Sequence, residues 1–147
     1  MFPPATMTPI TLPNLLAPVG IALVAIALMS LVREPARQKF SAILMAGAGA
    51  TYFNGGLGGA EMVFCAVVTL LASRGLSDYR ALGVAWLMHS GWDLVHDLWG
   101  TPIIPFAPGS LFGCFVCDPV IAIWHFMGAP SVWTRFRRGH AMPGRAS

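Results

Sequence analysis

The fold class is decided by a long uncharged run, LLAPVGIALVAIALMSLV at residues 15–32. The run follows Pro13 and is closed by the stretch Arg33-Glu34-Pro35, which stops a helix and supplies interfacial charge. A helix needs about 20 mostly apolar residues to cross a bilayer core, so this run predicts a membrane span. A cleaved signal peptide is the alternative, but residues 1–14 contain no Lys or Arg.

The composition of the whole chain also indicates a membrane protein. Its 147 residues are 56% hydrophobic and 10% charged, with a mean hydropathy of +0.67. Soluble domains average about 25% charged residues, which argues against a water-soluble domain and against disorder. Three cysteines are too few for a disulfide scaffold. The length allows four or five crossings and no separate soluble domain, so we treat residues 1–147 as one membrane domain.

Helix breakers and charges divide the chain into five apolar runs. The second run is rich in Ala and Gly, which lets neighbouring helices pack closely in lipid. The fifth contains Pro119, which is tolerated where neighbouring helices satisfy the freed backbone groups. The predicted spans are residues 15–32, 40–53, 60–73, 79–99 and 110–132, followed by a basic cytoplasmic tail at 133–147.

The nine basic residues orient these spans. They fall only after the first span, around the turn between the third and fourth spans, and in the tail. Because cytoplasmic loops accumulate Lys and Arg, five spans place all three segments on one side. The sequence therefore predicts an all-α, multi-pass bundle in the cell (inner) membrane, with the N-terminus outside and the C-terminus cytoplasmic. The net charge of +3 indicates contact with the lipid bilayer, not with nucleic acid.

The fourth span carries ionisable residues that are costly in a membrane. Such a group costs at least about 2.5 kcal/mol at the centre of a span, so it usually faces the bundle and marks a function. At about 100° per residue, His89, Asp93 and His96 share one narrow face. Asp97 lies at the edge of that face and is interpreted as interfacial. The alternative for the whole face is structural hydrogen bonding to neighbouring helices.

The fifth span adds Cys114, Asp118 and His125 on one face. Counting inward from the outer ends at about 1.5 Å per residue places Asp93 and Asp118 at similar depth, so the two carboxylates can meet. His125 lies deeper, and we expect it to be a structural histidine. Glu61 begins the third span on the same outer side, where an interfacial role is the alternative.

These positions predict a polar site in the outer half of the bundle. Carboxylates and imidazoles on adjacent helices can bind a divalent metal. Without a metal, Asp93, Asp118 and His89 could act as acid–base groups of a membrane enzyme with an apolar or lipid-like substrate. The candidate metal ligands are Glu61, His89, Asp93, His96 and Asp118.

A second motif, Cys114-Phe115-Val116-Cys117, lies near the outer start of the fifth span. It resembles the C-x-x-C of quinone-linked disulfide-forming membrane proteins, which would make Cys114 and Cys117 redox residues and quinone the cofactor. Those proteins carry a second cysteine pair in an outer loop, whereas here only Cys65 remains. Metal ligation by the thiols and simple packing are the alternatives.

Five short stretches carry a wider resemblance: SLVREP at 30–35, AGAGA at 46–50, GWDLVH at 91–96, PIIPF at 102–106 and GCFVCDP at 113–119. Together the chain from about 15 to 132 resembles an uncharacterised bacterial membrane family, the domain-of-unknown-function family six thousand and ten. The resemblance implies a compact multispan protein and implies no activity.

His89 and Asp93 also fit the His-x-x-x-acid spacing of small five-span sterol isomerases, in which a facing acid helps to stabilise a carbocation. This likeness implies an enzyme with Asp118 or Glu61 as the facing acid. Three other functions stay open: a thiol redox protein, a transporter or proton pathway in which a homo-oligomer supplies a pore, and a structural or partner-binding membrane subunit.

Overall fold

The structure is a computed structural model that describes residues 8–54, 56–100, 103–104, 107 and 109–134. This part of the chain is an all-α bundle of five α-helices and one short 3-10 helix, η1. The helices are α1 Leu12–Met29, α2 Ala36–Ala50, η1 Thr51–Asn54, α3 Gly59–Gly75, α4 Tyr79–Trp99 and α5 Ser110–Phe126. The predicted all-α class and the five helical segments are confirmed, and η1 forms the end of the second run.

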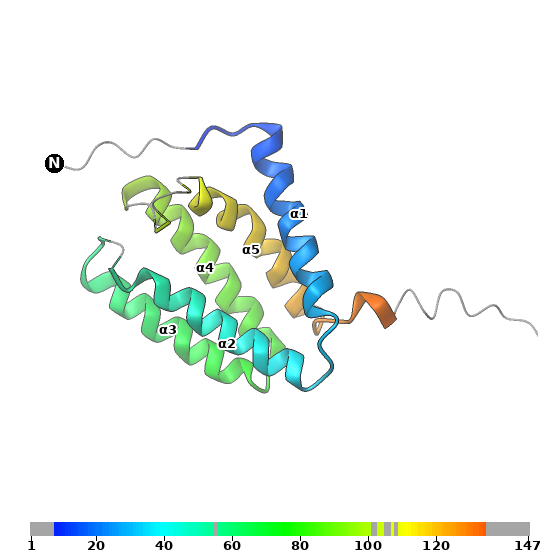
Figure 1. Ribbon diagram of the computed structural model, residues 1–147. Helices are drawn as coiled ribbons and strands as arrows, with labels where there is room; N and C mark the ends of the chain where they lie inside the picture. The colour runs from blue at the N-terminus through cyan, green and yellow to red at the C-terminus, as the bar shows by residue number, and fades with distance from the viewer. Residues whose placement is uncertain (1–7, 55, 101–102, 105–106, 108, 135–147) are drawn as a thin grey trace, which may run out of the picture.

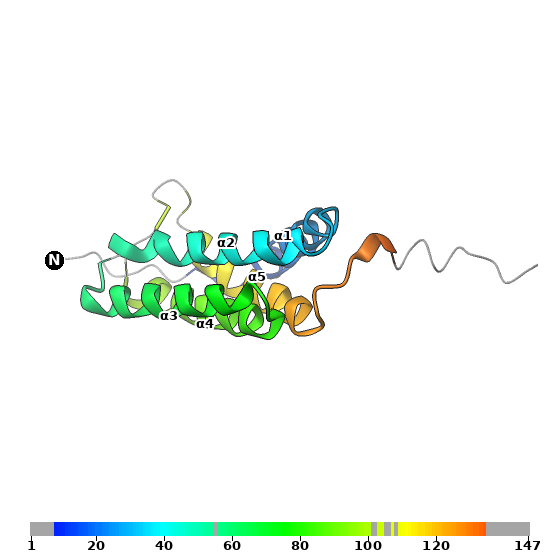
Figure 2. The ribbon, with the colours of Figure 1, turned by 90° about the horizontal axis from the view of Figure 1, so that it is seen from below.

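Helix α4 occupies the centre of the bundle. It packs against α2, α3 and α5, while α1 packs against α5. Figure 1 shows α4, α5 and α1 side by side, and Figure 2 shows α2 lying over α3. Successive helices alternate in direction, so the α1–α2 and α3–α4 connections lie at one end of the bundle (Figure 1). The described basic residues gather at that end: Arg33, Arg37, Lys39, Arg74 and Arg80. The other four lie outside the described residues.

One described helix is both long and apolar enough to cross a membrane. Helix α1 has a mean hydropathy of 2.1 over 18 residues, although a signal sequence near the N-terminus would meet the same criterion. Helices α2, α3 and α5 have 15, 17 and 17 residues, fewer than the usual span of about 20. Helix α4 has 21 residues but includes two aspartates and two histidines. By length and hydropathy, α1 is thus the one candidate membrane span among the described helices.

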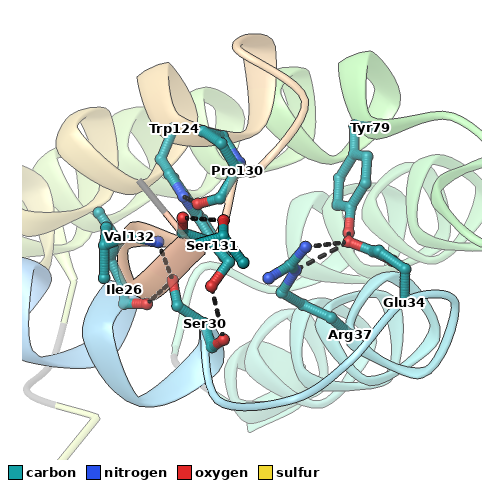
Figure 3. Close-up of polar contacts among 10 residues, drawn as sticks. Ile26, Ser30, Glu34, Arg37, Tyr79, Trp124, Pro130, Ser131 and Val132 are labelled. Carbon is teal, nitrogen blue, oxygen red and sulfur yellow. Dashed lines mark hydrogen bonds and ion pairs between the residues drawn. The ribbon is translucent and has the colours of Figure 1, made fainter. Parts of the chain in front are cut away.

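Helix α5 ends at Phe126, six residues before the predicted boundary at 132. Gly128 and Ala129 adopt φ values of 79° and 45°, the left-handed region in which a helix does not continue. The chain then turns back onto the end of α1. There the Ser131 hydroxyl donates to the Ser30 carbonyl at 3.0 Å (Figure 3). This return was not predicted, because the apolar run continues past Gly128, the glycine at which the helix stops.

A polar cluster joins the α1–α2 connection to the start of α4 (Figure 3). Oε1 of Glu34 accepts hydrogen bonds from the Tyr79 hydroxyl at 2.6 Å and from Nε of Arg37 at 2.8 Å. Burial by itself would lower the pKa of the Arg37 guanidinium, but its hydrogen bonds to Tyr79 and Glu34 outweigh that effect and raise it. Arg37 therefore stays charged and holds this end of the bundle together.

Gly49 marks a close approach of α2 to α3. A Cβ at this position would lie 2.7 Å from Cγ1 of Val68, which is fully buried, whereas a Cβ at Gly47 meets nothing within 4 Å. We expect Gly49→Ala to lower the free energy of unfolding by about 1–3 kcal/mol through overpacking. Gly47→Ala should leave it unchanged or slightly higher, because alanine favours helix. Denaturant unfolding in detergent measures both, and equal stabilities would contradict the close approach.

Candidate functional site

Three buried side chains from two helices meet at one point. His89 and Asp93 lie one turn apart on α4, and Asp118 faces them from α5. Nδ1 of His89 lies 3.1 Å from Oδ2 of Asp93 and 2.8 Å from Oδ2 of Asp118. One ligand atom from each residue lies within 4.8 Å of the other two, and the three residues are 6%, 0% and 3% exposed. The structure thus brings together the residues that helical spacing and depth had placed near one another. We call them the triad.

Tyr52 completes this site and was not among the sequence candidates. It lies in η1, is buried, and donates a hydrogen bond from its hydroxyl to Oδ1 of Asp93. Its ring packs edge-on against the His89 ring, with centroids 5.3 Å apart. The sequence contains only two tyrosines, and one at the end of an apolar run is most simply interpreted as an interfacial residue. The tertiary contact between η1 and α4 gives Tyr52 its role.

Glu61 and His96 form a second buried pair beside the triad. Nε2 of His96 lies 3.5 Å from Oε1 of Glu61. The same Glu61 oxygen accepts a hydrogen bond from the Leu57 backbone N–H at 3.0 Å, which fixes it at the start of α3. The Tyr52 ring contacts the rings of both His89 and His96. The five predicted ligands are therefore all buried, but they divide into a triad and a neighbouring pair.

His125 and Asp97 lie apart from this site. Nδ1 of His125 donates to the Ile121 carbonyl at 2.9 Å, and its ring packs against Trp124 with centroids 4.9 Å apart. This environment is the structural one that we expected for His125. Asp97 is half-buried near the end of α4 and is not a member of the triad. These two residues can therefore serve as matched controls.

The three cysteines are free thiols in two different places. Cys65 donates a hydrogen bond to the Gly49 carbonyl at 3.0 Å, between α3 and α2. Cys114 and Cys117 line a pocket between α1 and α5. Within the described part of the chain, no further cysteine accompanies the C-x-x-C motif, so the structure adds no second thiol pair.

The donor set of the triad fits a divalent cation. Ligands about 2.1 Å from a cation and at right angles to one another lie about 3 Å apart, and the two distances from His89 Nδ1 are close to that value. Two carboxylates and a neutral imidazole carry a formal charge of −2, which is costly inside a bundle without compensation. A divalent cation would balance this charge with no change in protonation.

The comparisons with known proteins identify the family and go no further. A family of unknown function, DUF6010, matches residues 13–131 of this sequence. The chain belongs to the DUF6010 family. The resemblance found in the sequence motifs is thus confirmed, and no curated protein and no solved structure matches the chain. The triad, Tyr52 and the Glu61–His96 pair all lie inside the DUF6010 region.

Proposed function

We propose that this DUF6010 protein is a multi-pass membrane protein whose triad binds a divalent cation, and that it is a small membrane enzyme acting on a lipid-like substrate. The observation that carries the proposal is the convergence of three buried ligand atoms within 4.8 Å. Nδ1 of His89 and the carboxylates of Asp93 and Asp118 would hold the cation, and imidazole with carboxylate suits several first-row divalent metals. A bound cation would supply a Lewis acid that polarises a substrate oxygen.

Tyr52 belongs to the same site but is not one of the three proposed cation ligands. Its hydroxyl bonds to Oδ1 of Asp93, while Oδ2 of that carboxylate faces His89. Such a hydrogen bond fixes the orientation of a ligating carboxylate, and loss of a bond of this kind commonly weakens metal affinity by about 10–100-fold. We therefore assign Tyr52 to positioning Asp93.

The distribution of apolar and polar residues supports a membrane location. Every α-helix exposes large apolar side chains, while the ionisable triad and the Glu61–His96 pair are buried. Water-soluble proteins bury such apolar groups, whereas a membrane bundle presents them to lipid and keeps its ionisable groups inside. Representative exposed residues are Leu16, Ile21 and Val24 on α1, Ile43 on α2, Val63 and Leu70 on α3, Leu87 on α4, and Ile123 on α5.

The alternating helix directions support the five-span topology. The connections that carry the described basic residues lie at one end of the bundle (Figure 1), as a cytoplasmic side requires. Helices α2 and α3 are short, and a bilayer accommodates short spans by local thinning and by extension of flanking polar side chains. The lipid bilayer is the partner that this arrangement implies, and a homo-oligomer is compatible with it.

Metal analysis tests the cation site, and labelling from either side of the membrane tests the topology separately. We expect protein purified in mild detergent to retain about one divalent cation per chain. Cysteines introduced at two exposed positions, Ser77→Cys in the α3–α4 connection and Ala60→Cys in the first turn of α3, should react with an impermeant maleimide from opposite sides of the membrane. Protein that cannot be loaded with Zn²⁺, Mn²⁺ or Fe²⁺ would contradict the cation site. Labelling of both positions from one side would contradict the topology.

A further inference from the structure

A pocket of about 440 Å³ opens between α1 and α5. Its walls are almost entirely apolar, formed by Ala17, Pro18 and Ile21 of α1 and by Phe112 and Gly113 of α5. Small-molecule sites usually enclose about 300–1,000 Å³ and are lined mainly by apolar side chains. The pocket therefore has the size and the lining of a binding site for a hydrocarbon chain.

One wall residue of this pocket, Cys114, lies near the triad. Cys114 lines the pocket and lies one helical turn before Asp118, so the two residues share a face of α5. The Cys114 thiol is close enough to Asp93 and Asp118 to interact with both carboxylates electrostatically. An apolar chain in the pocket would thus have its inner end beside the proposed cation site.

The charges around the pocket restrict the end group of such a molecule. No Lys or Arg occurs among the described lining residues, and the charged groups beside them are acidic: Asp93 and Asp118 near Cys114, and Asp97, which accepts a hydrogen bond from the Thr8 backbone. An anionic head group would be repelled by these carboxylates and would find no basic partner. An uncharged oxygen, as in an alcohol, aldehyde or ketone, avoids this penalty and is a suitable ligand for a hard cation.

We propose that the α1–α5 pocket binds the hydrocarbon chain of an uncharged, lipid-like molecule and presents its hydroxyl or carbonyl oxygen past Cys114 to the triad. The assignment of the oxygen to the cation rests on the proposed function, whereas binding of the chain does not. This role also accounts for Cys114 and Cys117 as small wall residues of a substrate pocket.

Gly113 offers a substitution that fills the pocket without disturbing the helix interface. A Cβ at Gly113 would meet only Cγ of Pro18, at 3.9 Å, so a larger side chain can extend into the pocket. Gly20 on α1 is the matched control, because a Cβ there meets nothing within 4 Å and Gly20 does not line the pocket. Gly113→Leu should therefore block the pocket, and Gly20→Leu should leave it open.

The probe is a long-chain alcohol with a diazirine group in its chain, added to the purified protein in detergent micelles and photolysed. We expect adducts on the α5 segment 110–117, and about tenfold fewer in Gly113→Leu, because the leucine side chain and the alcohol chain would compete for the same packed space. Gly20→Leu should label like the wild type, and the sulfate ester of the same alcohol should label this segment poorly. Equal labelling in Gly113→Leu, or equal labelling by the sulfate ester, would overturn the proposal.

Cysteine alkylation gives an independent readout in the same samples. The alcohol should slow the reaction of Cys114 and Cys117 with maleimide and leave Cys65 unaffected, since Cys65 lies between α2 and α3. Cation binding, measured separately, should persist in Gly113→Leu. If the wild type binds no cation but the alcohol still labels the pocket selectively, the proposed function is refuted and the pocket is not. If the wild type binds the cation but the alcohol labels the protein unselectively, the pocket is refuted and the cation site is not.

Discussion

Asp93→Asn is expected to weaken divalent-cation binding by about 100-fold or more. Asparagine keeps the shape of aspartate but removes the negative charge, and its amide is a much poorer ligand than a carboxylate. Asp93 is also the residue on which the His89 and Tyr52 contacts converge. Changing a residue that only supports a ligand commonly costs about 10–100-fold, so loss of the ligand itself should cost at least the upper end of that range.

Asp97→Asn is the control for this experiment. Asp97 lies on the same helix, one turn beyond Asp93, and is half-buried outside the triad. Isothermal titration calorimetry of each cation-free variant with Zn²⁺ or Mn²⁺ measures the affinity for the cation. Asp97→Asn should bind like the wild type. Equal affinity in the two variants would show that the cation, if bound, is held elsewhere.

Local periodicity was enough to predict much of this site. Residues His89, Asp93 and His96 share a face of α4 because their spacing repeats with the helix, and that spacing is a property of sequence alone. Asp118 could be placed opposite Asp93 because both lie at similar distances from the outer helix ends. The composition, with few charges and many apolar residues, similarly predicted a helical bundle without any knowledge of packing.

Contacts between distant elements could not be predicted in the same way. Tyr52 reaches Asp93 only because its side chain extends from η1 to α4, and Glu61 contacts His96 because α3 begins beside the end of α4. The end of α5 has a local cause: Gly128 adopts the left-handed backbone, and the Ala129 N–H then donates to the Trp124 carbonyl at 2.9 Å. The apolar run that continues to Val132 obscured this signal. Helical spacing determines which residues share a face, and packing determines which faces meet.

His89→Ala should destabilise the cation-free protein by about 3–5 kcal/mol, the usual cost of removing one partner from a buried charged group. In the wild type, Nδ1 of His89 lies between the Asp93 and Asp118 carboxylates. Without the imidazole, two carboxylates face each other in the interior and lose the ring nitrogen that lies within hydrogen-bond distance of both. Unfolding by denaturant in detergent, with a chelator present, measures this loss of stability.

The double variant His89→Ala/Asp118→Asn separates electrostatics from packing. If repulsion between carboxylates causes the loss, neutralising Asp118 should recover part of it, so the two substitutions will not be additive. His125→Ala is the control: His125 is also buried, and its one hydrogen bond among the described residues goes to the Ile121 carbonyl, so its loss should not be relieved by Asp118→Asn. Additive losses in the His89 double variant would mean that His89 only fills space. Recovery confined to that variant would identify the triad as a charged cluster whose stability depends on the hydrogen bonds of His89 to the two carboxylates.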